Sequence, residues 1–169
     1  MSGVDARDRD ADVGIAPNEA DEGGRHRGRE VALQVLYAID LGEVPSAAEE
    51  ETDDPATASL RAFDQVTEHF EVPGAAVAFA KRVVAGTAGK LSALDERIAQ
   101  HSRNWRVDRM AAVDRNVLRL ATWELLELDT PVAVVIDEAV DLARRFGSDT
   151  SPAFVNGILD AVARDVRAA

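Results

Sequence analysis

Apolar residues recur at helical spacing along most of the chain, and this feature limits the possible folds more than any other. They return every three or four positions in several segments, which places them on one face of an α-helix. Residues 132–136 could be read locally as a strand, but the helical spacing continues through Phe146. Glycine and proline separate the periodic segments. The pattern predicts an all-α fold, a single bundle of six or seven helices with short connections.

The spacing also predicts where the helices lie. Asp54 before Pro55 is an N-cap followed by a first-turn proline, and Ser92 with Asp95 forms a capping box. The segment 108–128 is apolar almost all round, so we expect it in the middle of the bundle. The predicted helices cover about 27–41, 55–70, 74–87, a segment from 92, 108–128, 131–146 and a segment from 151. A low aromatic content of 5% within 46% apolar residues also favours close helix packing.

The net charge of −12 is concentrated in two stretches. Residues 1–24 contain seven acidic residues and two arginines, and residues 43–71 contain nine acidic residues and one arginine. The rest of the chain is close to neutral, so a local basic patch can act within a Debye length of about 8–10 Å. Residues 1–24 lack periodicity. We expect a disordered acidic N-terminal tail over 1–24 and one helical domain over 25–169.

The composition argues against several classes of protein. The chain has no cysteine, which excludes disulfides, thiol catalysis and thiolate metal sites and is typical of a reducing compartment. It has no apolar run of about 18 residues and no secretory signal pattern. We therefore expect a cytoplasmic protein that does not span a membrane.

Sequence motifs for catalysis are lacking. The segment 86–91 resembles a phosphate-binding loop only faintly, because Leu91 stands where Ser or Thr must bind magnesium. The three histidines are far apart, and neither an HExxH pair nor a GxSxG elbow occurs. The many acidic residues leave a paired-carboxylate hydrolase open, but nothing favours it over a solvated acidic face. We expect a binding protein that is not an enzyme and has no metal or cofactor.

Four basic residues, Arg25, His26, Arg27 and Arg29, lie at the predicted start of the first helix. Cations at a helix N-terminus oppose the helix dipole, so their position indicates an external anion. Tyr37 lies two turns beyond Arg29 on the same side. Arginines for phosphates and a ring for an unpaired base are typical of single-stranded RNA binding. Alternatively, the arginines only solubilise the junction, and Tyr37 packs with its hydroxyl outward.

Several segments form a specific combination when their order and spacing are taken together. They are RHRGREVALQVLY (25–37), VDRNVLRLA (113–121), WEL (123–125), VIDEAVDLA (135–143) and SPAFVNGILD (151–160), the last being the most specific. Together they resemble the NusB family of bacterial transcription antitermination factors. The resemblance covers about residues 25–166.

The resemblance implies a seven-helix fold and a role in transcription. Family members pair with NusE, a small-subunit ribosomal protein, and the pair binds the boxA element of ribosomal RNA leaders on transcribing RNA polymerase. By position, the arginine-rich motif of the family falls on Arg25, His26, Arg27 and Arg29, and its helix-one tyrosine falls on Tyr37. We therefore expect that removing Arg27 and Arg29 together weakens RNA binding and leaves folding nearly unchanged.

The resemblance also implies roles for residues beyond the arginine motif. Asp108 and Phe154 fall on positions near the RNA, although Asp108 could instead be an N-cap and Phe154 could belong to the core. Asp114 falls where the family contacts NusE, and Arg115 and Arg119 are neighbouring candidates for that contact.

Three residues depart from the family pattern. His26 and Gly28 interrupt the arginine run, which predicts a lower or more pH-dependent affinity for RNA. Thr150 stands where family members commonly have an acidic residue, which predicts an altered affinity for RNA or partner. The sequence does not distinguish a monomer from a homodimer, define the RNA sequence or explain the two acidic stretches.

Two other functions are compatible with the helical pattern. The N-terminal domain of ribosomal RNA cytosine methyltransferases resembles NusB and targets RNA, but such an enzyme needs a methyltransferase domain that these 169 residues lack. A helical protein–protein adaptor could use the acidity of the chain to bind basic ribosomal proteins. An adaptor would show no RNA binding that depends on the arginines.

Overall fold

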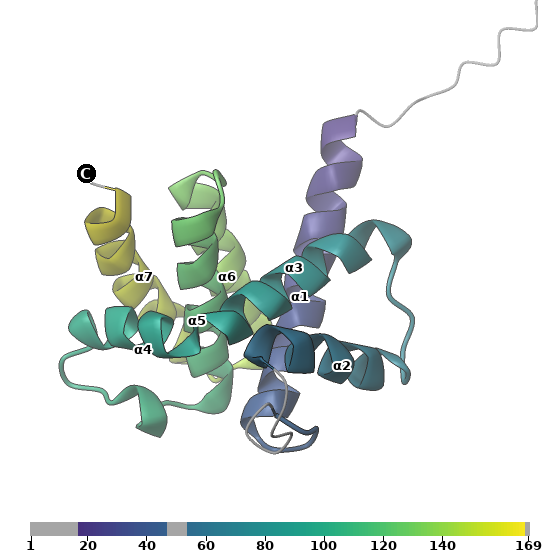
Figure 1. Ribbon diagram of the computed structural model, residues 1–169. Helices are drawn as coiled ribbons and strands as arrows, with labels where there is room; N and C mark the ends of the chain where they lie inside the picture. Colours follow the sequence, from purple (N-terminus) through teal and green to yellow (C-terminus); the bar gives the residue numbers. More distant parts are fainter. Residues whose placement is uncertain (1–16, 47–53, 168–169) are drawn as a thin grey trace, which may run out of the picture.

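The computed structural model describes residues 17–46 and 54–167 and contains, over these ranges, seven α-helices and one short 3₁₀ helix (Figure 1). The predicted all-α fold is confirmed, and residues 132–136 are helical. The elements are α1 (Pro17–Asp40), α2 (Pro55–Thr67), α3 (Gly74–Gly89), α4 (Leu91–Gln100), η1 (Val107–Arg109), α5 (Ala112–Glu127), α6 (Val132–Phe146) and α7 (Ser151–Arg167).

Helix α5 forms the centre of the bundle, as its all-round apolar sequence predicts. It packs against α1, α3, α4, α6 and α7, and every residue from Asn116 to Leu125 is buried. Figure 1 shows α1, α2 and α3 on one side of α5 and α6 and α7 on the other. The core therefore continues across α5 from one group of helices to the other.

Helix α1 begins at Pro17, about ten residues before the predicted start at Arg27. Residues 17–24 are thus helical, and their assignment to a disordered tail was wrong; residues 1–16 lie outside the described ranges. The sequence signal is a proline at the first helical position, followed by acidic residues in the first two turns. As a result, the basic cluster lies two turns inside the helix. Its arginines therefore do not oppose the dipole of a helix N-terminus, contrary to our expectation.

Two glycines allow α1 to pack closely on α3. A Cβ on Gly24 would lie 2.8 Å from the carbonyl oxygen of Ala75, and one on Gly28 would lie 2.9 Å from Cδ1 of Phe79. Any larger residue would push the helices apart. Gly28, which interrupts the arginine run of the family, therefore has a packing role in this chain.

The predicted helix caps are confirmed in one case and wrong in two. Asp54 accepts hydrogen bonds from the backbone N–H groups of Ala56 and Thr57 at 3.0 and 3.2 Å. Ser92 does not cap α4, which begins at Leu91. Asp108 does not cap α5, since it lies inside η1. A short 3₁₀ turn therefore precedes the central helix.

Helix α3 continues through Gly86 to Gly89, slightly beyond its predicted end at about residue 87. A Cβ on Gly86 would lie 2.2–2.4 Å from three atoms of the Trp123 indole. Trp123, from α5, is only 5% exposed. Gly86 is thus required for close contact between α3 and α5.

Two threonines between these helices have buried hydroxyls that lack a partner among the described residues, Thr87 and Thr122. Thr122→Val replaces such a hydroxyl with a methyl group of similar size. We expect the free energy of unfolding to stay the same or to rise by about 1 kcal/mol, because an unpaired buried hydroxyl costs free energy. Urea denaturation measures the change.

Thr130→Val is the matched control for Thr122→Val. The Thr130 hydroxyl is buried but donates a hydrogen bond to Glu124 at 3.0 Å, so its loss is expected to cost about 1 kcal/mol. A similar loss for Thr122→Val would show that the hydroxyl of Thr122 has a partner.

In the parts of the chain that the structure describes, none of the helices combines the length and the apolar character needed to span a membrane.

Candidate nucleic-acid interface

The basic residues of α1 point in two directions. Arg25 and Arg29, four residues apart, both face α3, and their guanidinium carbons lie 5.4 and 5.1 Å from the centroid of the Phe79 ring. His26 and Arg27 lie toward α6 and are partly exposed. Arg25 and Arg29 therefore share one side of α1, which faces the inside of the bundle.

Arg29 is buried in an ion pair with Glu124 of α5. The distances are 2.9 Å from Nε to Oε2 and 2.5 Å from Nη2 to Oε1, and the residues are 3% and 1% exposed. The Thr130 hydroxyl donates a third hydrogen bond to Glu124. The expectation that every arginine of the motif is free in solution is therefore wrong for Arg29. This residue joins α1 to α5.

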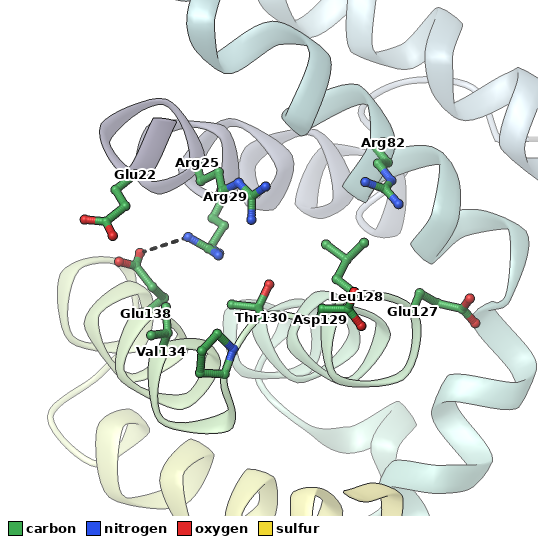
Figure 2. Close-up of a pocket in the computed structure, with 11 residues that line it drawn as sticks. Glu22, Arg25, Arg29, Arg82, Glu127, Leu128, Asp129, Thr130, Val134 and Glu138 are labelled. Atoms are coloured by element: carbon green, nitrogen blue, oxygen red, sulfur yellow. Dashed lines mark ion pairs between the residues drawn. The ribbon is translucent and has the colours of Figure 1, made fainter. Parts of the chain in front are cut away.

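A polar pocket opens beside this ion pair, between α1, α3 and the start of α6 (Figure 2). Arg25, Arg29 and Arg82 lie on one wall, and Glu127 and Asp129 lie on the facing wall. With Glu22 and Glu138, the lining has four carboxylates against these three arginines, so the pocket lacks the net positive potential that attracts a polyanion. The outer side of α1 is therefore the better candidate for an RNA interface.

The outer side of α1 carries a cluster that we call the shared-carboxylate cluster, consisting of His26, Arg27, Glu30, Glu138 and Arg145. Arg27 donates to Glu30 at 2.8 Å, and Arg145 of α6 donates to the other oxygen of the same carboxylate. His26 lies 2.7 Å from Glu138 and 3.2 Å from Glu30. Helix α1 is thereby joined to the C-terminal end of α6.

The two arginines of this cluster remain available to a ligand. The side chain of Glu30 is 6% exposed, whereas those of Arg27 and Arg145 are 34% and 46% exposed. Two guanidinium groups share one carboxylate, so one positive charge is not neutralised by Glu30. Each guanidinium has five N–H donors, and most of those on Arg27 and Arg145 have no protein acceptor. Such a group can bind a phosphate without losing its internal ion pair.

Burial alone would raise the pKa of Glu30, but hydrogen bonds from Arg27 and Arg145 outweigh it and hold the pKa below its ordinary value. A carboxyl group whose pKa is lower in the folded state contributes to stability at pH values above about 4.5, the ordinary pKa of the group. This contribution is lost as the pH falls through the lower pKa of the folded state.

Glu30→Gln should therefore reduce the dependence of stability on acidic pH. We expect the free energy of unfolding at pH 7 to fall by roughly 1 kcal/mol, since the ionic hydrogen bonds become neutral. The difference between variant and wild type should shrink below about pH 4.5. Thermal melts between pH 3 and 7 measure it. Glu96→Gln, at an exposed position of α4, is the control. If Glu30→Gln and wild type lost the same amount of stability between pH 7 and pH 3, the lowered pKa of Glu30 would be contradicted.

The other predicted RNA contacts lie on three separate elements. Tyr37 is half-buried on α1. Asp108 is exposed in η1, where Arg106 donates to its carboxylate at 3.1 and 3.0 Å. Phe154 is half-buried at the start of α7 and packs against the core, with its ring 5.8 Å from that of Trp105. Their contact with RNA stays a prediction.

The three predicted partner contacts lie around the start of α5. Arg115 donates to Asp40 at 2.8 and 2.6 Å, and Arg119 donates to Asp95 at 2.8 Å through two nitrogens. Both arginines thus have internal structural roles. Asp114 is 8% exposed, and its Oδ1 has no hydrogen-bond partner among the described residues. Asp114 therefore has a buried acceptor that no described residue satisfies.

Two residues near these positions were missed by sequence reasoning. Arg145 lies in the last turn of α6, where a basic residue is usually explained by the helix dipole. Trp105 lies in a non-helical connection and has no periodic signal. Tertiary structure brings Arg145 to Arg27 and Trp105 to Phe154. The described residues include no group of three or more His, Asp or Glu side chains suited to a metal ion.

The seven-helix bundle and the partly exposed arginines on α1 and α6 are features of a helical nucleic-acid-binding protein. The sequence pattern of the NusB family matches residues 26–164, and the chain belongs to this family.

Relatives support the assignment over most of the chain. The transcription antitermination protein NusB of Anaeromyxobacter dehalogenans 2CP-1 is 48% identical over 139 residues, which cover 82% of this chain and 89% of the relative. NusB of Sorangium cellulosum So ce56 is 45% identical over 147 residues, covering 85% and 94%.

Solved structures share the fold. The structure of T. maritima NusB is 34% identical, with a TM-score of 0.64, and the match covers 83% of this chain and 91% of that one. A crystal structure of the antitermination factors NusB and NusE in complex with double-stranded RNA is 27% identical, with a TM-score of 0.68 and coverage of 85% and 98%.

Proposed function

We propose that the protein is a transcription antitermination factor that binds boxA-type single-stranded RNA of ribosomal RNA leaders together with ribosomal protein NusE. The observation that carries this proposal is the shared-carboxylate cluster, in which Arg27 and Arg145 keep exposed N–H donors around one buried carboxylate. The relatives are antitermination proteins, and one neighbouring structure is a complex of NusB and NusE with RNA. Membership in a family of non-enzymatic factors supports a role without catalysis.

The RNA backbone runs along the outer side of α1 in this proposal. Arg27 and Arg145 contact phosphates, and His26 lies beside them. Arg25 contacts the RNA from the side of α1 that faces α3. Arg29 acts indirectly, because its ion pair with Glu124 fixes the position of α1 on α5. Tyr37, Asp108 and Phe154 contact the RNA farther along.

NusE binds near the start of α5 in this proposal. The buried Oδ1 of Asp114 lacks an internal partner among the described residues, and an unpaired buried acceptor is costly unless a ligand satisfies it. The complex of protein, RNA and NusE then joins transcribing RNA polymerase in the cytoplasm.

Arg27→Ala tests the RNA contact. We expect the affinity for a single-stranded boxA RNA oligonucleotide to fall about fivefold at 0.1 M salt, with the log–log salt slope reduced by about 0.7. The melting temperature should change little, because Arg145 still neutralises Glu30. Fluorescence anisotropy with labelled RNA measures both quantities.

Arg164→Ala is the matched control, since Arg164 is an exposed arginine on α7 that is paired with Asp160. It removes the same charge outside the proposed interface and should leave the affinity for RNA unchanged. Equal losses in both variants would indicate a general charge effect. Tighter binding of a duplex of the same sequence would contradict the single-stranded assignment, and binding to NusE without any binding to RNA would favour an adaptor.

A further inference from the structure

The connection between α4 and α5 presents an exposed tryptophan in a basic surrounding. Trp105 is 61% exposed, the highest value among the exposed large apolar side chains of the described residues. Arg103, Arg106 and Arg109 are exposed in the same connection. An indole this open to water loses the free energy that its burial would give, which suggests that a ligand covers it.

The Trp105 ring is held in a defined position. It meets the Phe154 ring of α7 edge to face, with an interplanar angle of 81° and a centroid distance of 5.8 Å. The backbone N–H of Trp105 donates to the Ser102 carbonyl at 2.8 Å, and the Ser102 hydroxyl donates to the Trp105 carbonyl at 3.1 Å. A ring fixed in this way loses little conformational entropy when it stacks on a ligand.

The charges around this ring are positive and largely unpaired. Arg106 and Asp108 pair with each other at 3.0 Å. Arg103 and Arg109 are exposed and have neither an ion pair nor a side-chain hydrogen bond within the described ranges. Two uncompensated cations thus lie within four residues of an open aromatic ring in a protein of net charge −12.

The connection lies at the C-terminal end of α1. Arg115 donates to Asp40, three residues after Tyr37, and also to the carbonyl oxygens of Val107 and Met110 at 3.4 and 3.1 Å. Figure 1 shows the α4–α5 connection and the end of α1 on the same side of the bundle. The connection thus lies near the end of α1 that carries Tyr37, and its tryptophan contacts Phe154, so it adjoins two of the predicted RNA contacts.

We propose that Trp105 stacks on an unpaired nucleobase of the bound single-stranded RNA, while Arg103 and Arg109 contact the phosphates beside that base. This inference rests on the proposed function and adds a second contact region to it. An open ring between unpaired cations is the combination that single-stranded nucleic acid requires. A basic protein such as a ribosomal protein would be repelled by the two free arginines, so RNA is the favoured occupant.

Trp105→Ala and Trp105→Phe test the stacking. We expect alanine to weaken binding of the boxA oligonucleotide about tenfold and phenylalanine to restore most of the loss, since stacking needs only an aromatic face. An oligonucleotide with an abasic site at the stacked base should bind wild type and Trp105→Ala equally. Leu60→Ala, at an exposed position of α2, is the control.

Intrinsic fluorescence gives an independent measure. Trp123, the second tryptophan, is 5% exposed, so quenching by unlabelled RNA reports on Trp105. Arg103→Ala and Arg109→Ala should each reduce the log–log salt slope by about 0.7, and Arg164→Ala should not.

The outcomes separate this inference from the proposed function. Loss of RNA binding in Arg27→Ala with unchanged binding in Trp105→Ala would overturn the stacking role and leave the proposed function intact. Unchanged RNA affinity with weaker binding of isolated NusE in Trp105→Ala would show that the connection is a protein interface and would overturn the inference. A wild-type protein that binds no RNA would overturn both.

Discussion

Arg29→Ala is expected to lower the free energy of unfolding by about 3–5 kcal/mol, because it leaves the Glu124 carboxylate buried without its cation. Glu124 is 1% exposed and lies in the last turn of α5. Its remaining hydrogen bond, from the Thr130 hydroxyl, is neutral. A loss of this size is a large fraction of the stability of a typical domain. Chemical denaturation followed by circular dichroism measures it.

The double variant Arg29→Met with Glu124→Leu is the control for this prediction. Replacing a whole buried ion pair with apolar side chains is often nearly neutral, so most of the lost stability should return. We expect the double variant to bind RNA within about twofold of wild type, since a buried guanidinium makes little contact with phosphate. A folded double variant that no longer binds RNA would show that Arg29 contacts RNA directly.

This prediction replaces our expectation that Arg27 and Arg29 can be removed together without affecting stability. The structure separates the two residues. Arg27 is 34% exposed and shares its carboxylate with Arg145, whereas the side chain of Arg29 is 4% exposed and lies beside a buried glutamate. We expect a stability change only for the Arg29 variant.

Gly86→Ala is expected to destabilise the protein by about 2 kcal/mol or more. The added methyl group would overlap the Trp123 indole at 2.2–2.4 Å, and overpacking of a core typically costs about 1–3 kcal/mol. This cost exceeds the gain of about 1 kcal/mol that alanine brings to a helix interior. The midpoint of urea denaturation should therefore fall.

Gly157→Ala is the matched control for Gly86→Ala. A Cβ at Gly157, in the middle of α7, would have no other atom within 4 Å. Here the helix preference of alanine acts alone, and we expect a gain of about 0.5–1 kcal/mol. Gly86→Ala combined with Trp123→Leu should recover part of the loss. A stabilising effect of Gly86→Ala in the wild-type background would contradict the packing of α3 on α5.

Much of the fold could be predicted from the sequence because helix period and helix ends are local properties. The central position of α5 followed from apolar residues on all of its sides. The cap at Asp54 followed from its position directly before Pro55. The start of α1 at Pro17 was missed, although its proline and acidic first turns are local signals as well.

The candidate site was predicted less well because burial and pairing depend on residues far apart in the chain. Arg25, His26, Arg27 and Arg29 look alike in sequence. Their partners come from α3, α5 and α6, and only these decide which side chain is buried. The exposure of Trp105 likewise depends on how the connection between α4 and α5 packs against Phe154 of α7.

Taken by itself, the sequence determined the helical class, the approximate limits of most helices and the family, because these follow from spacing and from short motifs. Only the tertiary structure decided that Arg29 fills a structural position, that Arg27 and Arg145 share Glu30, and that Gly86 makes room for Trp123. The physical reason is that the free energy of a charge or a cavity depends on the atoms that surround it, and those atoms lie on other helices.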